Sequence, residues 1–190
     1  MPAERVYVAG MLPAALVTAE ELSLVSIPDK HVELVRGVLE VREPPGYTHG
    51  RVTVNLLMRL AAHVERAQSG HVLVTETGFT LARGPDTVRG PDLAVVRRDR
   101  VPSPEPRGFL ELAPELIVEV LSPGDRAGEV LAKVADWLTA GTRLVWVVDP
   151  ERRVARVYRG DGSEAIVAAD EGLDGEDVLP AFSCTLSEVL

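Results

Sequence analysis

Three charged residues could form one site, and two of them are acids in stretches that otherwise have the pattern of buried strands. Asp92 opens one predicted strand, Glu119 lies near the end of the apolar run 116–121, and Lys133 follows shortly after. Charged side chains are seldom buried without a partner, so these two carboxylates and the lysine predict a site that holds a divalent cation beside a phosphate. Oxygen ligands suit Mg²⁺, which binds proteins through one or two carboxylates. The chemistry of such a site is phosphodiester hydrolysis by metal-activated water.

Two further residues could support this chemistry. Lys133 would orient the attacking water or stabilise the transition state, and it is one of only two lysines among the 20 basic residues. A compact ammonium therefore looks selected at this position. Glu33, on the first strand of a predicted hairpin, could supply another ligand. His49 precedes the first long helix, where it could cap the helix or contact the substrate.

The two carboxylates that we predict as metal ligands, Asp92 and Glu119, also have structural interpretations. Asp92 could cap a turn after Pro91, as aspartate often does. Glu119 needs a partner if its strand is buried, and that partner could be a structural arginine such as Arg126 or Arg143.

Lys133 and Glu33 have ordinary alternatives as well. Lys133 lies near the edge of an apolar helical stripe, where a lysine is commonly solvated. Glu33 could be an exposed hairpin residue that pairs with an arginine on the neighbouring strand. Spacing alone does not separate these alternatives from a shared site.

Hydrophobic periodicity predicts the elements that would position these residues. A capping box at Thr18 and Glu21 starts a short helix to about residue 25, and residues 32–43 form a hairpin around Arg36-Gly37. Other predicted elements are a long helix from about 52 to a stop at Gly70, two strands within 71–82, strands at 92–96 and 115–121, a helix at 127–140 that stops at Gly141, and strands at 143–148 and 154–158. The sum is an α/β fold of about seven strands and two main helices.

Composition bounds the class of protein. The 190 residues are 46% hydrophobic, which is enough for one domain with a core, and we expect a single domain over 1–190 with an N-terminal arm at 1–17. The single cysteine, Cys184, excludes an internal disulfide and fits a cytoplasmic location. The apolar segment 6–19 is too short to span a membrane, so we expect no membrane partner. The net charge of −9 argues against broad attraction to nucleic acid.

Several motifs occur together in the order seen in one family. The chain resembles the Uma-two family of bacterial endonucleases, formerly a domain of unknown function, within the PD-(D/E)XK restriction-endonuclease-like superfamily. The residues that carry this resemblance are His31 to Leu34, Gly37, His49, Pro91-Asp92, Glu119 to Pro123, Lys133 and Trp146 to Pro150.

The resemblance implies a restriction-endonuclease-like mixed sheet flanked by helices, preceded by an N-terminal helix and hairpin. It also implies Asp92 and Glu119 as ligands of Mg²⁺ or Mn²⁺, with Glu33 as an added acid. One position departs from the superfamily pattern, because Leu121 stands where the usual lysine would follow the glutamate by two residues. In this family a lysine on a helix is thought to take that role, which would be Lys133.

The predicted function is therefore a Mg²⁺-dependent endonuclease that cuts DNA, with homodimerisation as a further implication of the resemblance. A catalytically silent module of the same fold, binding nucleic acid or protein, is the alternative that the acidic charge and the displaced lysine favour. A hydrolase of a smaller phosphate ester would instead show a closed pocket.

Overall fold

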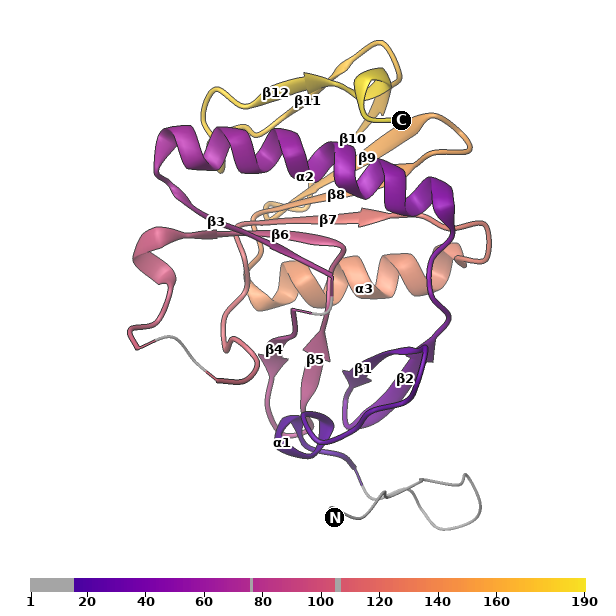
Figure 1. Ribbon diagram of the computed structural model, residues 1–190, viewed down its shortest axis with the longest axis vertical. Coiled ribbons are helices and arrows are strands. Elements are labelled where there is room, and N and C mark those ends of the chain that lie inside the picture. Colours follow the sequence, from indigo (N-terminus) through magenta and orange to yellow (C-terminus); the bar gives the residue numbers. More distant parts are fainter. Residues whose placement is uncertain (1–15, 76, 105–106) are drawn as a thin grey trace.

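A mixed six-stranded sheet occupies the middle of the molecule, between two long helices (Figure 1). The computed structural model describes residues 16–75, 77–104 and 107–190, so the first fifteen residues of the predicted N-terminal arm lie outside the described part. In sheet order, the strands are β10 (Glu164–Ala168), β9 (Val154–Arg159), β8 (Leu144–Asp149), β7 (Leu116–Val120), β6 (Leu93–Arg97) and β3 (Gly70–Val74). Only β7 and β8 of this sheet pair in parallel, and the helix α3 (Ala127–Ala140) connects them.

A smaller sheet lies beyond α3, at the end of the molecule that carries the short helix α1 (Ala19–Leu22) (Figure 1). Its strands, in order, are β2 (Val38–Arg42), β1 (His31–Val35), β5 (Thr87–Arg89) and β4 (Phe79–Ala82). The other long helix is α2 (Tyr47–Ala67), and the strand pair β11 (Gly172–Asp174) and β12 (Ser183–Thr185) lies at the opposite end of the molecule. Single-turn helices η1 (Arg98–Arg100) and η2 (Leu186–Glu188) complete the described elements.

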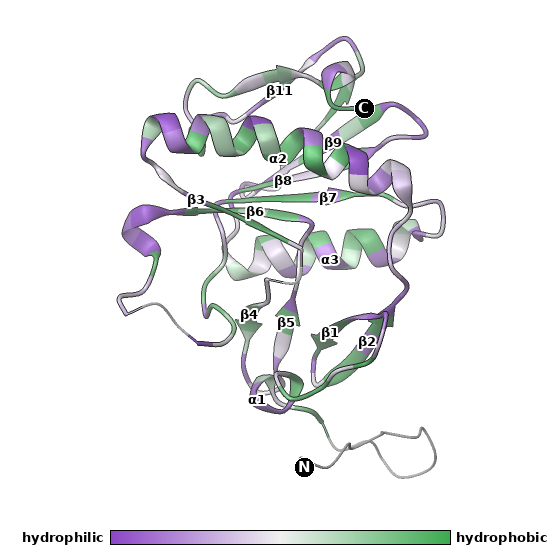
Figure 2. Cartoon of the chain, viewed as in Figure 1, coloured by the Kyte–Doolittle hydropathy of each residue, from purple (hydrophilic) through white to green (hydrophobic). Residues whose placement is uncertain are grey.

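Strand alternation divides the core between the two long helices. In β7, Leu116, Val118 and Val120 belong to the apolar cluster that includes α2, whereas Ile117 packs with Trp137 of α3. Successive side chains of a strand point to opposite faces, so Glu119 shares the α3 face with Ile117. Hydropathy colouring follows this layering, with apolar residues concentrated along the central strands (Figure 2). The mixed sheet flanked by helices confirms the predicted fold class.

Local signals placed several elements correctly. Thr18 and Glu21 form the predicted capping box, and α3 runs from Ala127 to Ala140 with Gly141 in the left-handed region at φ 107°. The hairpin turns at Arg36 and Gly37, both with positive φ, as a tight two-residue turn requires.

The predicted helix stop at Gly70 is wrong. The helix α2 ends at Ala67 and is capped by Gln68, which adopts φ 51°, and Gly70 already belongs to β3. A Cβ atom at Gly70 would lie 2.1 Å from the carbonyl oxygen of Val96 on the neighbouring strand. The glycine is needed because two strands approach closely, and not because a helix ends there.

The strand count was also too low. Among the described residues there are twelve strands, and the short strands β5, β10, β11 and β12 were not predicted. The two strands expected within 71–82 exist, but β3 and β4 belong to different sheets. None of the helices in the described segments is long and apolar enough to cross a membrane.

The buried side chain of Arg89 joins the smaller sheet to α3. Only 2% of this side chain is exposed, and Nη1 donates to Glu33 Oε2 and Glu40 Oε2 at 2.9 Å each. Its Nε and Nη2 atoms donate to Asp136 Oδ2 at 3.0 and 2.7 Å. These contacts connect β1, β2 and β5 to the helix that packs on the six-stranded sheet.

Removing this guanidinium should strongly destabilise the fold. We expect Arg89→Met to lower the free energy of unfolding by about 3–5 kcal/mol, because Glu33 would lose a buried partner. Urea unfolding followed by circular dichroism measures the change. The control is Arg97→Met, which removes an exposed ion pair with Asp99 and should change stability by less than about 0.5 kcal/mol. Equal effects of the two substitutions would contradict the structural role of Arg89.

Candidate active site

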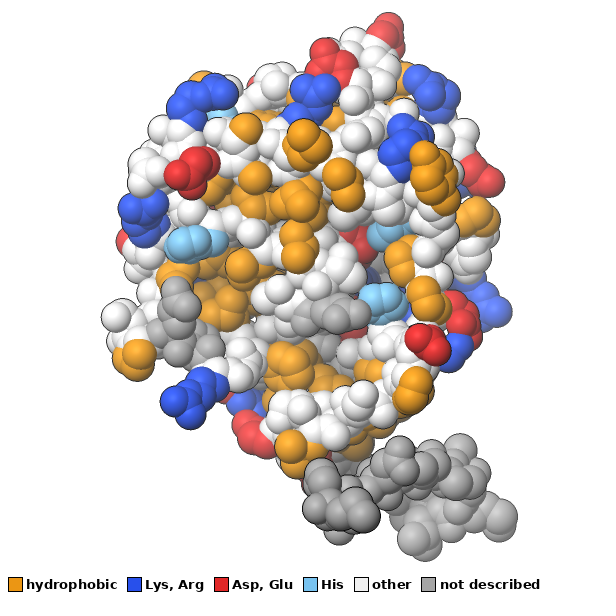
Figure 3. All heavy atoms as spheres, viewed as in Figure 1, with side chains coloured by type: hydrophobic (Ala, Val, Ile, Leu, Met, Phe, Trp, Pro, Cys, Tyr) orange, Lys and Arg blue, Asp and Glu red, His pale blue; other side chains and the backbone are white. Residues whose placement is uncertain are grey.

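A cleft of about 1190 Å³ opens between the two sheets. All five residues singled out in the sequence line it: Glu33, His49, Asp92, Glu119 and Lys133. In the space-filling view this face is hollowed between α2 and the smaller sheet, with acidic and histidine side chains at the hollow (Figure 3). The separate sequence motifs therefore meet in one place.

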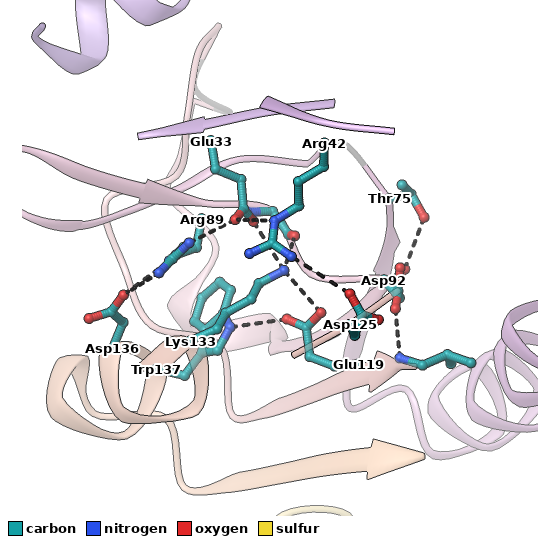
Figure 4. A network of polar contacts seen from close by, with 12 residues as sticks. Glu33, Arg42, Thr75, Arg89, Asp92, Glu119, Asp125, Lys133, Asp136 and Trp137 are labelled. Atoms are coloured by element: carbon teal, nitrogen blue, oxygen red, sulfur yellow. Dashed lines mark hydrogen bonds and ion pairs between the residues drawn. The ribbon is translucent and has the colours of Figure 1, made fainter. Parts of the chain in front are cut away.

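Lys133 lies at the centre of this group. Its Nζ atom is 3.0 Å from Glu119 Oε2 and 3.1 Å from Glu33 Oε1, and it donates to the carbonyl oxygen of Gly90 at 3.0 Å. Only 12% of the Lys133 side chain is exposed, so the solvated alternative is excluded. The ammonium joins β1, β7 and the segment before β6 (Figure 4).

One side of α3 supplies both partners of Glu119. Trp137 is four residues after Lys133 and therefore lies on the same helical face. Its Nε1 atom donates to Glu119 Oε1 at 3.2 Å, while Lys133 contacts Oε2. Arg126 and Arg143, the structural partners considered for Glu119, instead contact Glu129 and Asp177.

Asp92 lines the cleft with Glu119, and its carboxylate is held by the backbone of the residue after Glu119. Its Oδ2 atom accepts a hydrogen bond from the backbone N–H of Val120 at 2.7 Å and lies 3.0 Å from His49 Nε2. His49 is in the first turn of α2, so that helix and β7 both fix the aspartate. Asp92 has no direct contact with Lys133 or Glu33 among the contacts of the described residues.

The pKa values of Glu119 and Glu33 are shifted in opposite directions. Burial raises the pKa of Glu119 to about 7, with repulsion from Asp92 and Glu33 adding to the rise and Lys133 opposing it. Burial would also raise the pKa of Glu33, but Lys133, Arg89 and the N–H of Gly90 outweigh it and hold that pKa below its usual value. Glu33 is thus the firmly ionised acid, and Glu119 carries the less compensated charge.

Lys133 and His49, two of the basic groups that line the cleft, are both shifted toward their charged forms. Burial opposes the charge of Lys133, yet the carboxylates of Glu119, Glu33 and Asp92 raise its pKa above the usual value. Burial likewise opposes protonation of His49, but the hydrogen bond and charge of Asp92 raise its pKa. Lys133 is accordingly a permanent cation at neutral pH.

The acidic side chains of the cleft are carboxylates, the ligand type that Mg²⁺ takes from proteins. In the ranges that the structure describes, no group of three or more His, Cys, Asp or Glu side chains is arranged to hold a metal, which does not fit a closed all-protein site. Mg²⁺ commonly binds through one or two carboxylates and retains waters. Asp92 and Glu119 both line the cleft, and the charge of Asp92 adds to the rise that burial causes in the pKa of Glu119, so an added cation would relieve that repulsion.

Sequence reasoning missed the residues around this group. Arg89, Asp136 and Arg42 extend the polar network (Figure 4), and none was singled out. For Arg89 one signal was available, since it directly follows Thr87-Val88 and precedes Gly90-Pro91-Asp92. An arginine next to a predicted site acid and after a β-branched pair could have suggested a buried ion pair.

Comparisons with known proteins agree with the fold and the motifs. The model of the Uma2 family, described as "Putative restriction endonuclease", matches residues 19–187. A solved structure of a putative nuclease belonging to DUF820, from Anabaena variabilis ATCC 29413, is similar in fold, with a TM-score of 0.80 and 19% sequence identity. The similarity covers 91% of this chain and 97% of that one. No curated protein matches the chain. Because the family model spans nearly the whole sequence, the chain belongs to the Uma2 family of restriction-endonuclease-like proteins.

Proposed function

We propose that this protein is an endonuclease that hydrolyses DNA phosphodiester bonds with the help of Mg²⁺ or Mn²⁺. The observation that carries the proposal is the position of Lys133 Nζ, 3.0 Å from Glu119 Oε2, in a cleft that Asp92 also lines. Membership in a restriction-endonuclease-like family supports a nucleic-acid substrate. The cleft volume of about 1190 Å³ exceeds the common range for small-molecule pockets, which favours a polymeric substrate over a small phosphate ester.

In this proposal, Asp92 and Glu119 hold the cation. When bound, a divalent cation polarises the phosphoryl group and lowers the pKa of a coordinated water. His49 and the N–H of Val120 fix the orientation of Asp92, and Trp137 fixes one oxygen of Glu119. These contacts pre-organise the two carboxylates before any ligand binds.

Lys133 would act as a cation and hydrogen-bond donor and not as a general base. Its pKa is raised by the surrounding carboxylates, so it stays protonated throughout the neutral range. An ammonium has three donors, and Lys133 directs them to Glu119, Glu33 and Gly90. We expect it to keep the contacts with Glu33 and Gly90 and to exchange the contact with Glu119 for a phosphate oxygen, where it stabilises the developing charge.

The position of Lys133 compensates for the departure from the superfamily pattern in this proposal. Leu121, at the position of the usual lysine, packs against the apolar cluster beneath α3. Lys133 approaches Glu119 from that same helix, on the same face of the sheet. A helical lysine thus supplies an ammonium to the face from which a lysine at 121 would have come.

A catalytically silent binding module is the second candidate. The observation that favours it is that both proposed ligands already have internal donors, from Lys133 and Trp137 for Glu119 and from His49 and Val120 for Asp92. A structural network of this kind needs no cation. The two candidates differ in their response to metal and in cleavage.

DNA cleavage tests the proposed reaction. Purified protein is incubated with single-stranded and duplex DNA in Mg²⁺ or Mn²⁺, and we expect Asp92→Asn and Lys133→Met each to lower the cleavage rate at least about 100-fold. Asp177→Asn, which alters an exposed acid paired with Arg143, should leave the rate unchanged. Cleavage that survives Asp92→Asn would indicate a contaminating nuclease and overturn the assignment.

Thermal unfolding tests the cation site without relying on activity. Mg²⁺ or Mn²⁺ at about 100 times its dissociation constant should stabilise the wild-type protein by about 2.7 kcal/mol. The response should disappear in Asp92→Asn and persist in Glu188→Gln, which alters an exposed acid that contacts Arg59. If neither cation changes the melting temperature of the wild-type protein, the silent module is the better description.

A further inference from the structure

Arg89 and Arg42 both lie beside the buried acid Glu33, but their side chains are held very differently. Arg89 is 2% exposed and makes contacts of 2.7 to 3.0 Å. Arg42, the last residue of β2, is 33% exposed, and its closest acidic oxygens lie 3.5 Å away on Glu40, 3.8 Å on Asp125 and 4.0 Å on Glu33. Short ion pairs therefore fix the guanidinium of Arg89, whereas the guanidinium of Arg42 makes only long contacts with acids.

Each acid near Arg42 has another, closer donor. Glu33 Oε2 and Glu40 Oε2 both accept from Arg89 at 2.9 Å. Asp125 accepts a hydrogen bond from the backbone N–H of Ser122 at 2.7 Å. The charge of these acids is therefore already compensated in part, and Arg42 can leave them at little cost.

The position of Arg42 gives this guanidinium access to the reacting centre. Arg42 lines the main cleft and also a smaller cavity that it shares with Glu119 and Lys133. In the close view its side chain reaches from β2 across the network toward Asp125 (Figure 4). Its Nε atom is buried and has no hydrogen-bond partner, since the nearest carboxylate oxygen, Glu33 Oε2, lies 4.0 Å away; an unsatisfied buried donor is costly.

We infer that Arg42 binds a phosphate group of the nucleic acid in the cleft. This inference rests on the proposed function, because it assigns a second phosphate contact to the same site. A planar guanidinium presents paired N–H donors that match two phosphate oxygens, and such a pair would satisfy the orphan Nε donor. Arg42 thereby acts as a substrate-binding residue that reaches the cleft from β2, whereas Lys133 reaches it from α3.

Steady-state kinetics separates binding from chemistry. Using fluorescein-labelled 30-nucleotide single-stranded and duplex DNA, we expect Arg42→Gln to raise KM about tenfold while kcat changes less than about twofold. Arg42→Lys keeps the positive charge but loses the paired N–H donors of the guanidinium. Its KM should therefore fall between those of the wild type and Arg42→Gln. The slope of log KM against log salt concentration should also fall by about one in Arg42→Gln, because one phosphate contact is lost.

The matched control is Arg59→Gln, since Arg59 is 41% exposed and pairs with Glu188 away from the cleft. Its KM and salt dependence should equal those of the wild type. An unchanged KM in Arg42→Gln, or a loss confined to kcat, overturns the inference and leaves the nuclease proposal intact.

A second measurement keeps the inference testable if the protein cuts no DNA. Melting temperatures are compared in sodium phosphate and in sodium chloride of equal ionic strength. The stabilisation by phosphate should be smaller in Arg42→Gln than in the wild type and unchanged in Arg59→Gln, which corrects for the general effect of phosphate on proteins. Equal stabilisation of all three proteins overturns the inference.

Discussion

The structure depends on how it compensates the charge of acids buried between the four-stranded and the six-stranded sheets. Glu33 and Glu119 come from different sheets, and neither could remain charged in its surroundings without a positive partner. Lys133 contacts both of them, and Arg89 extends the connection from Glu33 to Asp136 on α3. The ion pairs of Lys133 thus connect the smaller sheet to the larger one and line the cleft, so stability and site geometry depend on shared contacts.

Lys133 is shared by Glu33 and Glu119, but the two carboxylates are not equally compensated. Glu33 has Arg89, Lys133 and the N–H of Gly90, and its pKa is lowered. Burial raises the pKa of Glu119 to about 7, and repulsion from two other acids adds to the rise, although Lys133 and Trp137 both contact this carboxylate. A purely structural network would gain stability by balancing both acids, because uncompensated buried charge is unfavourable. An imbalance retained at one carboxylate of an open cleft is typical of functional sites.

Sequence reasoning predicted the fold class and named five residues that line one cleft, but it missed several short strands around them. The run 116–121 and the helix 127–140 were recognisable because periodicity and glycine stops report local structure, and they positioned Glu119 and Lys133. The strand β5 is only three residues long, too short to show a period, so Arg89 was missed with it. Which arginine pairs with a buried acid depends on contacts 56 residues apart, and no local pattern encodes that choice.

The identity of residue 133 follows from the shape of the space that it fills. Its three acceptors come from three segments, Glu33 on β1, Glu119 on β7 and the carbonyl of Gly90, all within 3.1 Å of one nitrogen. A tetrahedral ammonium can direct one N–H to each, whereas a planar guanidinium could not meet three converging oxygens from a single point. Arginine supplies nearly all other positive charge in this chain. The guanidinium of Arg89, for example, donates to acceptors that lie apart, on Glu33, Glu40 and Asp136. The lysine is therefore required where the acceptors converge, and arginine suffices where they are spread.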